Sequence, residues 1–384
     1  MTTPVSSTVP ETKPSARGTF YRPELDTLRF FAFLTVFVAH TYWFPVDYFV
    51  KRHMPLWAAT ILNSVTCAGS FGVDLFFVLS AYLITELLLR EKEVQGYLDV
   101  KAFYIRRILR IWPLYYFFVT ASIFIPFLNP DHAFSLRYIL PFLFLAGNWS
   151  TVFFGPIHTA VFPLWSVSIE EQFYLLWPPI VAKLSRRNIM LTAAGMLVVG
   201  TITRLAAVLL HAKGWQVWQN TFARLDPIAT GILLAVLLGG RNPKITGRQR
   251  VALFASGLLF IILTGHFVAS WGEGTPALGT LLGYPVVAVS CAVIVYASIG
   301  VGIRSRALEY LGKISYGLYV YHYMCILIAE RFLHSNGIEH LYMLLREVIS
   351  LGLTVGVAAM SYALLEKPFL NLKRRFTHIH SRPV

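Results

Sequence analysis

Long apolar runs separated by short basic segments make up most of the chain. A helix needs about 17–25 mostly apolar residues to cross a bilayer, and ten runs meet that requirement. They cover residues 28–45, 69–89, 111–128, 164–183, 189–210, 222–239, 251–269, 278–299, 311–331 and 341–364. The pattern predicts an all-α membrane protein, a polytopic bundle of about ten transmembrane helices.

Basic residues gather between these runs and indicate their direction. Six clusters occur, at residues 13–22, 90–110, 183–187, 241–250, 304–313 and 367–375. Cytoplasmic loops are enriched in Lys and Arg, so all six are expected on the cytoplasmic side, with two spans in each gap and both termini cytoplasmic. The shorter run 138–148 would break this parity and is expected to be re-entrant or interfacial on the outer side.

The spans leave no room for a second folded domain. Residues 1–20 are rich in Ser, Thr and Pro and lack the apolar core of a signal peptide, which predicts a disordered cytoplasmic tail. Residues 21–370 are expected to form one transmembrane domain, and residues 371–384 a basic cytoplasmic tail.

Composition supports the membrane class. Of 384 residues, 56% are hydrophobic and only 14% are charged, far from the balance of a soluble protein. The net charge of +14 is assigned to basic loops that set the orientation and meet anionic lipid or an anionic cofactor, not nucleic acid. The three widely spaced cysteines, Cys67, Cys291 and Cys325, are interpreted as core residues, so no metal site is predicted.

The first run, YRPELDTLRFFAFLTVFVAH, carries two ionisable residues on one helical face. Arg29 and His40 are 11 positions apart, which separates them by about 16 Å along a helix axis. A charge at the centre of a span costs about 2.5–3.5 kcal/mol, so such groups are functional candidates by default. The alternative is that His40 only makes a hydrogen bond to a neighbouring helix.

Two acids also interrupt apolar runs. Asp74 lies in FGVDLFFVLSAYLIT and is expected to pair with an imidazole or a hydroxyl, or else to cap a helix at the interface. Asp226 precedes Pro227 in ARLDPIATG, an arrangement typical of a helix start. It is therefore expected to be a helix cap first and a site residue second.

Three arginines stand beside aromatic residues in YIRRILRIWPLYY. Arg106 and Arg110 are one turn apart and are expected to share a face, with Arg107 offset. The cluster is explained by cytoplasmic loop charge alone, but it also suits a phosphate-bearing cofactor whose base stacks on aromatic rings.

The fourth run begins PLWSVSIEEQFYLLWP and holds Glu170 and Glu171. Adjacent side chains point to different sides of a helix, so at most one of these carboxylates is expected to face a given site.

The ninth run, LGKISYGLYVYHYM, places His322 near mid-depth, with Ser315 and Tyr319 on nearby turns. A single histidine of this kind is commonly a hydrogen-bonded polar contact. Together with His40, it predicts a cavity shared between the first, fourth and ninth runs.

Taken in order, these motifs resemble the acyltransferase-3 family of integral-membrane O-acyltransferases, from Tyr21 to Phe369. Arg29 and His40 are similar to that family's Arg-x10-His pair, and FGVDLFFVLSAYLIT to its second-helix motif, with Ala81 where the family usually has Gly. IRRILRIWPLYY, PLWSVSIEEQFYLLWP, the Arg224–Asp226 pair, ISYGLYVYHY and LEKPFL follow in the family's order.

The resemblance implies an enzyme, an acyltransferase transferring groups other than aminoacyl groups, in a bacterial-type inner membrane. It implies transfer of an acyl group, most often acetyl, from cytoplasmic acyl-CoA to a hydroxyl of a carbohydrate or lipid-linked acceptor. On this resemblance Arg29 and His40 are the essential pair, Arg106, Arg107 and Arg110 contact coenzyme A, and Glu170 or Glu171 is the site acid. Further site candidates are Asp74, Trp165, Ser166, Asp226, Ser315, Tyr319 and His322.

The chemistry of imidazole agrees with that implication. A base must take the proton of the acceptor hydroxyl as the hydroxyl attacks the thioester, and imidazole suits this task at neutral pH. Direct transfer with His40 as base is preferred over an acyl-His40 intermediate. The alternative function is a proton-coupled transporter or flippase of a glycolipid or small solute, because intramembrane Glu and His also serve proton coupling.

Overall fold

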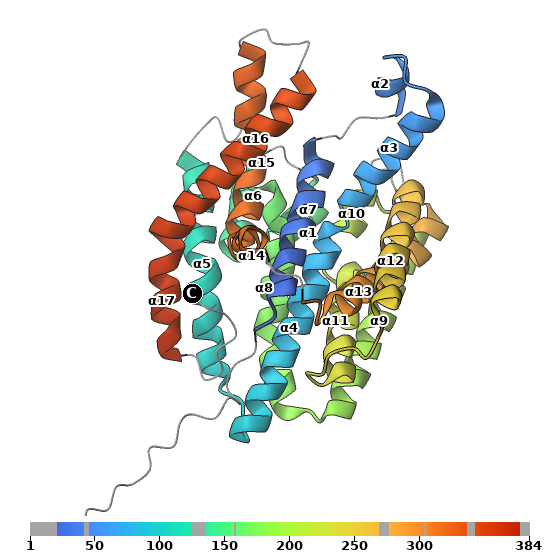
Figure 1. Ribbon diagram of the computed structural model, residues 1–384. Helices are drawn as coiled ribbons and strands as arrows, with labels where there is room; N and C mark the ends of the chain where they lie inside the picture. Colours follow the sequence, from blue (N-terminus) through green and yellow to red (C-terminus); the bar gives the residue numbers. More distant parts are fainter. Residues whose placement is uncertain are drawn as a thin grey trace, which may run out of the picture.

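The computed structural model describes residues 21–41, 46–124, 136–156, 159–268, 276–302, 305–335 and 342–376. All regular secondary structure in those ranges is helical, as predicted. The longer helices gather into one bundle, with α1 (Pro23–Thr41) and α8 (Trp165–Lys183) near its middle (Figure 1).

The remaining elements follow in chain order. The α-helices are α2 (Val46–Val50), α3 (Leu56–Gly69), α4 (Gly72–Gln95), α5 (Val100–Phe124), α6 (Leu136–Leu143), α7 (Gly147–Phe154), α9 (Arg186–Leu209), α10 (Gly214–Trp218), α11 (Leu225–Leu238), α12 (Gly247–Val268), α13 (Tyr284–Ser298), α14 (Arg306–Lys313), α15 (Ser315–Ser335), α16 (Tyr342–Ser361) and α17 (Lys367–Lys373). The short 3₁₀ segments are η3 (Phe162–Leu164), η4 (Phe222–Arg224) and η7 (Arg374–Phe376), and the π-helical segments are η5 (Gly279–Gly283) and η6 (Tyr362–Glu366).

Each of the ten predicted runs overlaps a helix, but length and composition support fewer membrane spans. Five helical stretches of the described chain are long and apolar enough to cross: Leu56–Gln95, Arg186–Leu209, Gly247–Phe267, Gly279–Ser298 and Leu345–Lys373. A helical membrane fold therefore fits the structure. The count of ten spans, the cytoplasmic termini and the domain boundaries stay predictions, and residues 1–20 and 377–384 of the predicted tails lie outside the described residues.

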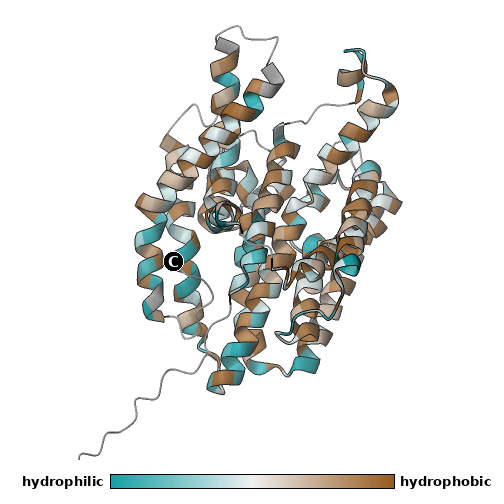
Figure 2. Ribbon diagram, viewed as in Figure 1, coloured by the Kyte–Doolittle hydropathy of each residue, from teal (hydrophilic) through white to brown (hydrophobic). Residues whose placement is uncertain are grey.

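The outer surface of the bundle has the character expected of contact with lipid. Most of the apolar stretch of α9 and of α12 is not buried inside the protein, and Figure 2 shows hydrophobic residues along much of the helices' length. Large apolar side chains such as Ile202, Leu209 and Phe267 are more than half exposed. Such a surface is stable in a bilayer and would favour aggregation in water.

Local sequence explains where several helices end. α4 ends at Gly96, whose φ of 78° is left-handed, and α11 ends at Gly239, with a φ of 51°. Glycine adopts this conformation without a steric penalty and is the usual residue after a helix. At the start of α9, the Ser185 hydroxyl accepts a hydrogen bond from the backbone of Asn188 at 3.3 Å, as a helix-capping serine does.

The structure adds detail to one predicted segment and shows one helix that was not predicted. The run 138–148 divides into α6 and α7, and Asn148 ties α7 to the protein by hydrogen bonds to Gln219 O (3.0 Å) and Thr221 Oγ1 (2.9 Å). α3 was not predicted, because its polar residues, among them Ser64 and Thr66, interrupt the apolar pattern. The hydroxyl of each residue donates a hydrogen bond to the backbone carbonyl one turn earlier, so both hydroxyls find partners within the helix.

Small residues bring α1 close to its neighbours. α1 packs against α3, α4, α14 and α15. A Cβ on Gly312 of α14 would overlap the carbonyl of Asp26, and one on Gly72 of α4 would overlap that of Ala32. Close approach through glycine is a common way for membrane helices to pack. It holds the end of α14 and the start of α4 against the helix that carries Arg29 and His40.

Candidate functional site

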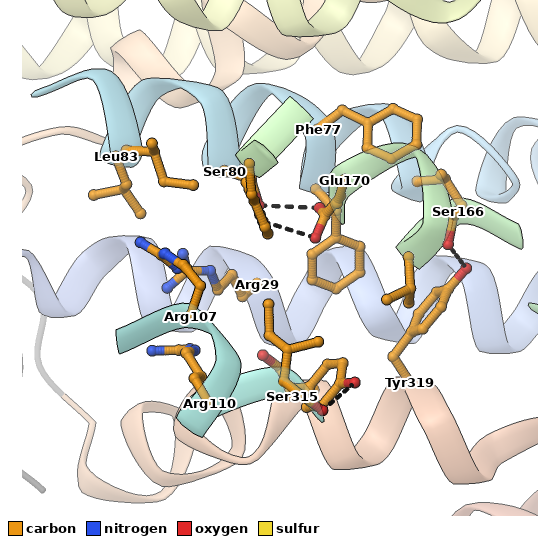
Figure 3. A pocket seen from close by; sticks show the side chains of 17 residues that line it. Arg29, Phe77, Ser80, Leu83, Arg107, Arg110, Ser166, Glu170, Ser315 and Tyr319 are labelled. Carbon is orange, nitrogen blue, oxygen red and sulfur yellow. Dashed lines mark hydrogen bonds between the residues drawn. The ribbon is translucent and has the colours of Figure 1, made fainter. Parts of the chain in front are cut away.

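Side chains of α1, α4, α5, α8 and α15 enclose a cavity inside the bundle (Figure 3). Its volume, with the open mouth included, is about 780 Å³, which is within the range for small-molecule sites. Seven of the predicted site residues line it: Arg29, Arg107, Arg110, Ser166, Glu170, Ser315 and Tyr319. The sequence therefore identified seven of the 17 lining residues, although its motifs lie far apart along the chain.

One end of the cavity is cationic. Arg29, Arg107 and Arg110 lie together there, as Figure 3 shows. Arg29 Nη1 is 3.1 Å from Asp26 Oδ1, and the guanidinium of Arg107 lies 5.3 Å from the ring centroid of Tyr174. Three guanidinium groups and a nearby aromatic face form a suitable setting for phosphate oxygens.

Arg106 does not belong to this cationic end. Its Nη2 is 2.7 Å from Glu91 Oε2, and its Nη1 donates to Phe376 O at 2.9 Å. Arg106 and Arg110 were expected to share a face with Arg107 offset, but it is Arg107 and Arg110 that line the cavity. Residues three or four positions apart can share a helix face, so either Arg107 or Arg106 could have accompanied Arg110. The buried carboxylate of Glu91 pairs with Arg106, so Arg106 turns away from the cavity and Arg107 turns toward it.

The two adjacent glutamates have separate environments. Glu170 lines the cavity and accepts hydrogen bonds from Ser80 Oγ (3.0 Å) and the Tyr174 hydroxyl (2.9 Å). Glu171 accepts from Trp112 Nε1 at 3.0 Å and is not part of the lining. Glu170 is therefore the acid that faces the cavity.

Ser80 and Tyr174 were missed in the sequence. Tyr174 is four residues after Glu170, one helical turn away, and this spacing could have suggested it. Ser80 is on another helix, and nothing in its local sequence distinguishes it.

The other end of the cavity is closed by a pair of hydroxyls. Ser166 Oγ is 2.6 Å from the Tyr319 hydroxyl, and Figure 3 shows this pair opposite the arginines. The ring of Phe76 packs edge-on against Tyr319, with centroids 5.7 Å apart. These three side chains form a layer across the inner end.

His40 and His322 meet each other beyond that layer. His322 Nε2 is 3.4 Å from His40 Nδ1, and neither residue lines the cavity. His322 is fully buried, whereas His40 is partly exposed. The structure brings the two histidines into contact, but the cavity lined by the arginines does not include them, because Tyr319, one turn before His322, occupies that boundary. Their shared cavity stays a prediction.

Three further candidates lie in the core, away from the cavity. Asp74 pairs with Arg224 at 2.6 Å, so its expected imidazole or hydroxyl partner was wrong. Asp226 lies in the first turn of α11 and pairs with Arg204, not with Arg224. Trp165 is 3% exposed in the same region. These ion pairs neutralise charges that would be costly if buried alone.

The described residues offer no obvious place for a metal ion. Within the ranges given above, no group of three or more His, Cys, Asp or Glu side chains is arranged to hold one. The polar groups of the cavity are guanidinium, hydroxyl and a single carboxylate, a set that suits an anionic organic ligand.

A helical bundle with an apolar outer surface and a partly cationic internal cavity fits an integral-membrane protein. The chain belongs to the acyltransferase-3 family: residues 22–364 match that family's model, described as an acyltransferase domain. The motifs had indicated this family, and its class of enzyme is the acyltransferases.

Several bacterial proteins are similar along the same stretch. The peptidoglycan O-acetyltransferase OatA of Listeria monocytogenes is 28% identical over 370 residues, which cover 91% of this chain and 56% of that protein. A putative O-acetyltransferase of Staphylococcus aureus is 27% identical (91% and 57% covered), as is the putative peptidoglycan O-acetyltransferase YrhL of Bacillus subtilis (91% and 55%). The chain thus spans little more than half of these relatives. No solved structure matches it significantly.

Proposed function

We propose that the protein is a membrane-embedded O-acyltransferase that moves an acyl group, with acetyl as the simplest case, from cytoplasmic acyl-CoA to a hydroxyl of a carbohydrate acceptor at a bacterial-type inner membrane. The observation that carries this proposal is the cavity itself. It has three arginines at one end, and its other end lies one turn of α15 from the His40–His322 pair.

Arg29, Arg107 and Arg110 would hold the phosphates of the donor. Guanidinium groups bind phosphate through paired N–H donors, and charge-assisted bonds of this kind are about twice as strong as neutral ones. Glu170, fixed by Ser80 and Tyr174, would keep Arg29 and Arg107 extended toward the cavity. Bound in this way, the donor supplies a thioester, whose chain can reach inward from the arginines toward Tyr319.

His40 would take the proton from the acceptor. Arg29 and His40 are separated by about 16 Å along α1, a distance that the arm of coenzyme A can span. The Ser166–Tyr319 layer lies between the cavity and His40, so transfer requires that layer to open. A closed layer keeps water from the thioester until the acceptor is present, a known way to suppress hydrolysis.

The relatives suggest the class of acceptor. Two of them are named as peptidoglycan O-acetyltransferases, one of these as putative. A glycan hydroxyl is accordingly the proposed acceptor here, presented on the side of the membrane where His40 is partly exposed.

The test is acyl transfer by purified protein in lipid nanodiscs, with radiolabelled acetyl-CoA and peptidoglycan fragments. We expect His40→Asn to lower transfer by about 10²–10⁴-fold, the usual contribution of a general base. The matched control is His211→Asn, because His211 is exposed, has a φ of 52° that asparagine tolerates, and is far from the cavity along the chain. Full activity of His40→Asn would contradict the proposal. Proton-coupled solute uptake by liposomes without acyl transfer would instead support the transporter.

A further inference from the structure

We infer that His322 is a positioning residue that, together with the Val36 carbonyl, keeps the proton of His40 on Nδ1 and stabilises the charge that forms on His40. The inference rests on the proposed role of His40 as base. It starts from the hydrogen bonds at three ring nitrogens of the two imidazoles, Nδ1 and Nε2 of His322 and Nδ1 of His40.

The proton on His322 is placed by a backbone carbonyl. His322 Nδ1 is 2.6 Å from Tyr319 O. A carbonyl oxygen can only accept, so Nδ1 carries the proton, and in the neutral ring Nε2 is then an acceptor. That Nε2 points at His40, 3.4 Å from its Nδ1.

The proton on His40 follows from this arrangement. His40 Nδ1 lies 2.9 Å from Val36 O and 3.4 Å from His322 Nε2. Both neighbours are acceptors, so a proton on Nδ1 satisfies them, whereas a lone pair there would face two others. The proton therefore occupies Nδ1, and the lone pair of His40 lies on Nε2, where it can act as a base.

His322 is held firmly enough to impose this arrangement. It is fully buried, and its ring packs against Phe33 (centroids 6.0 Å apart) and Tyr319 (5.4 Å). No carboxylate of the described chain has a hydrogen bond to either imidazole among the contacts found. The pair thus uses a neutral imidazole where many enzymes use an aspartate or glutamate to orient the base.

The same geometry stabilises the transferring state more than the resting one. As the acceptor oxygen forms its bond to the acyl carbon, its proton passes to His40 Nε2, and the carbon–sulfur bond breaks with its electron pair leaving on the thiolate. His40 is then a cation whose Nδ1–H faces Val36 O and His322 Nε2. Hydrogen bonds from a charged donor are stronger than those from a neutral one, so this contact contributes most when the proton has moved.

Two variants separate this role from packing. In His322→Gln the amide oxygen can occupy the place of Nε2 and accept from His40, whereas His322→Leu fills similar space without an acceptor. We expect His322→Leu to lower kcat about 10- to 100-fold, the value of one charge-assisted hydrogen bond, with KM for acetyl-CoA unchanged. His322→Gln should recover most of that loss. Equal kcat for His322→Leu and wild type, or no recovery in a stably folded His322→Gln, would overturn the inference.

A measurement on the wild-type protein stays decisive if the variants fold poorly. Nitrogen-15 NMR of histidine-labelled protein in lipid reports which nitrogen of each ring is protonated. We expect protonated Nδ1 and unprotonated Nε2 on both His40 and His322, and the opposite form of His40 would overturn the inference. The proposed function fails separately, if His40→Asn stays active. If His40→Asn is inactive but His322→Leu is fully active, the proposed function stands and only the role of His322 is rejected.

Discussion

Ser166 and Tyr319 share a hydrogen bond of 2.6 Å that links α8 to α15 at the inner end of the cavity. It leaves Arg29 on the cavity side and His40 on the other, although both residues are on α1. The two residues that the motif pairs along the sequence therefore differ in access to the cavity, and the hydroxyl pair lies at the end of the cavity nearer to the histidines.

Tyr319→Phe should increase the hydrolysis of acetyl-CoA in the absence of acceptor. The Tyr319 hydroxyl contacts both Ser166 Oγ (2.6 Å) and Pro163 O (3.1 Å). Loss of these neutral hydrogen bonds, of about 1 kcal/mol each, favours opening of the layer by at least about fivefold, so acetyl-CoA hydrolysis without acceptor should rise by at least that factor. The measurement is thiol release in the absence of acceptor. Tyr321→Phe is the matched control, because Tyr321 is on the same helix and bonds to Ser361 at 3.1 Å, outside the cavity lining. Unchanged hydrolysis in Tyr319→Phe would show that the bonds of its hydroxyl do not limit access.

Arg107→Ala and Arg110→Ala should weaken donor binding. Each removes a guanidinium from the cationic end, and one charge-assisted contact is worth about a tenfold or greater change in affinity. KM for acetyl-CoA should rise accordingly, and further in the double variant, with kcat less affected. Arg187→Ala is the control, because Arg187 is exposed in another basic cluster. An unchanged KM in the double variant would place the donor elsewhere.

Glu170→Gln and Glu171→Gln should differ although the residues are neighbours. Glu170 lines the cavity among the arginines, whereas Glu171 bonds to Trp112 outside it. Removal of the charge of Glu170 should lower kcat/KM by about tenfold or more, while Glu171→Gln keeps an acceptor for Trp112 and should stay within about threefold of wild type. Steady-state kinetics of both variants test this. A larger loss of kcat/KM in Glu171→Gln than in Glu170→Gln would contradict the conclusion that Glu170 is the acid that faces the cavity.

Asp74→Asn should destabilise the fold without a change in donor affinity. Asp74 and Arg224 are 1% and 0% exposed, and removal of one partner of a buried pair costs about 3–5 kcal/mol. Thermal unfolding in detergent should show a clear loss for Asp74→Asn, largely restored in the Asp74→Leu/Arg224→Leu double variant. If Asp74→Asn melts with wild-type protein and instead raises KM, Asp74 acts in the site and not in the core.

The sequence by itself determined the class of fold and identified seven residues that line the cavity. Apolar runs and their basic borders predict a helical membrane protein because both depend on composition over a window and not on distant contacts. Polar residues inside those runs are costly wherever they lie, so Arg29, His40, Glu170 and His322 stand out in the sequence.

Only the tertiary structure decided which face of each helix does what. Glu91 pairs with Arg106 outside the cavity. Ser80 donates a hydrogen bond to Glu170, the acid that faces the cavity. Arg224 pairs with Asp74 in the core. Tyr319, whose hydroxyl bonds to Ser166, lies at one end of the cavity, and His40 is not among the lining residues. Helical spacing defines which residues of one helix share a face. The helix that packs against this face comes from another part of the chain, so the local sequence does not indicate which helix it is.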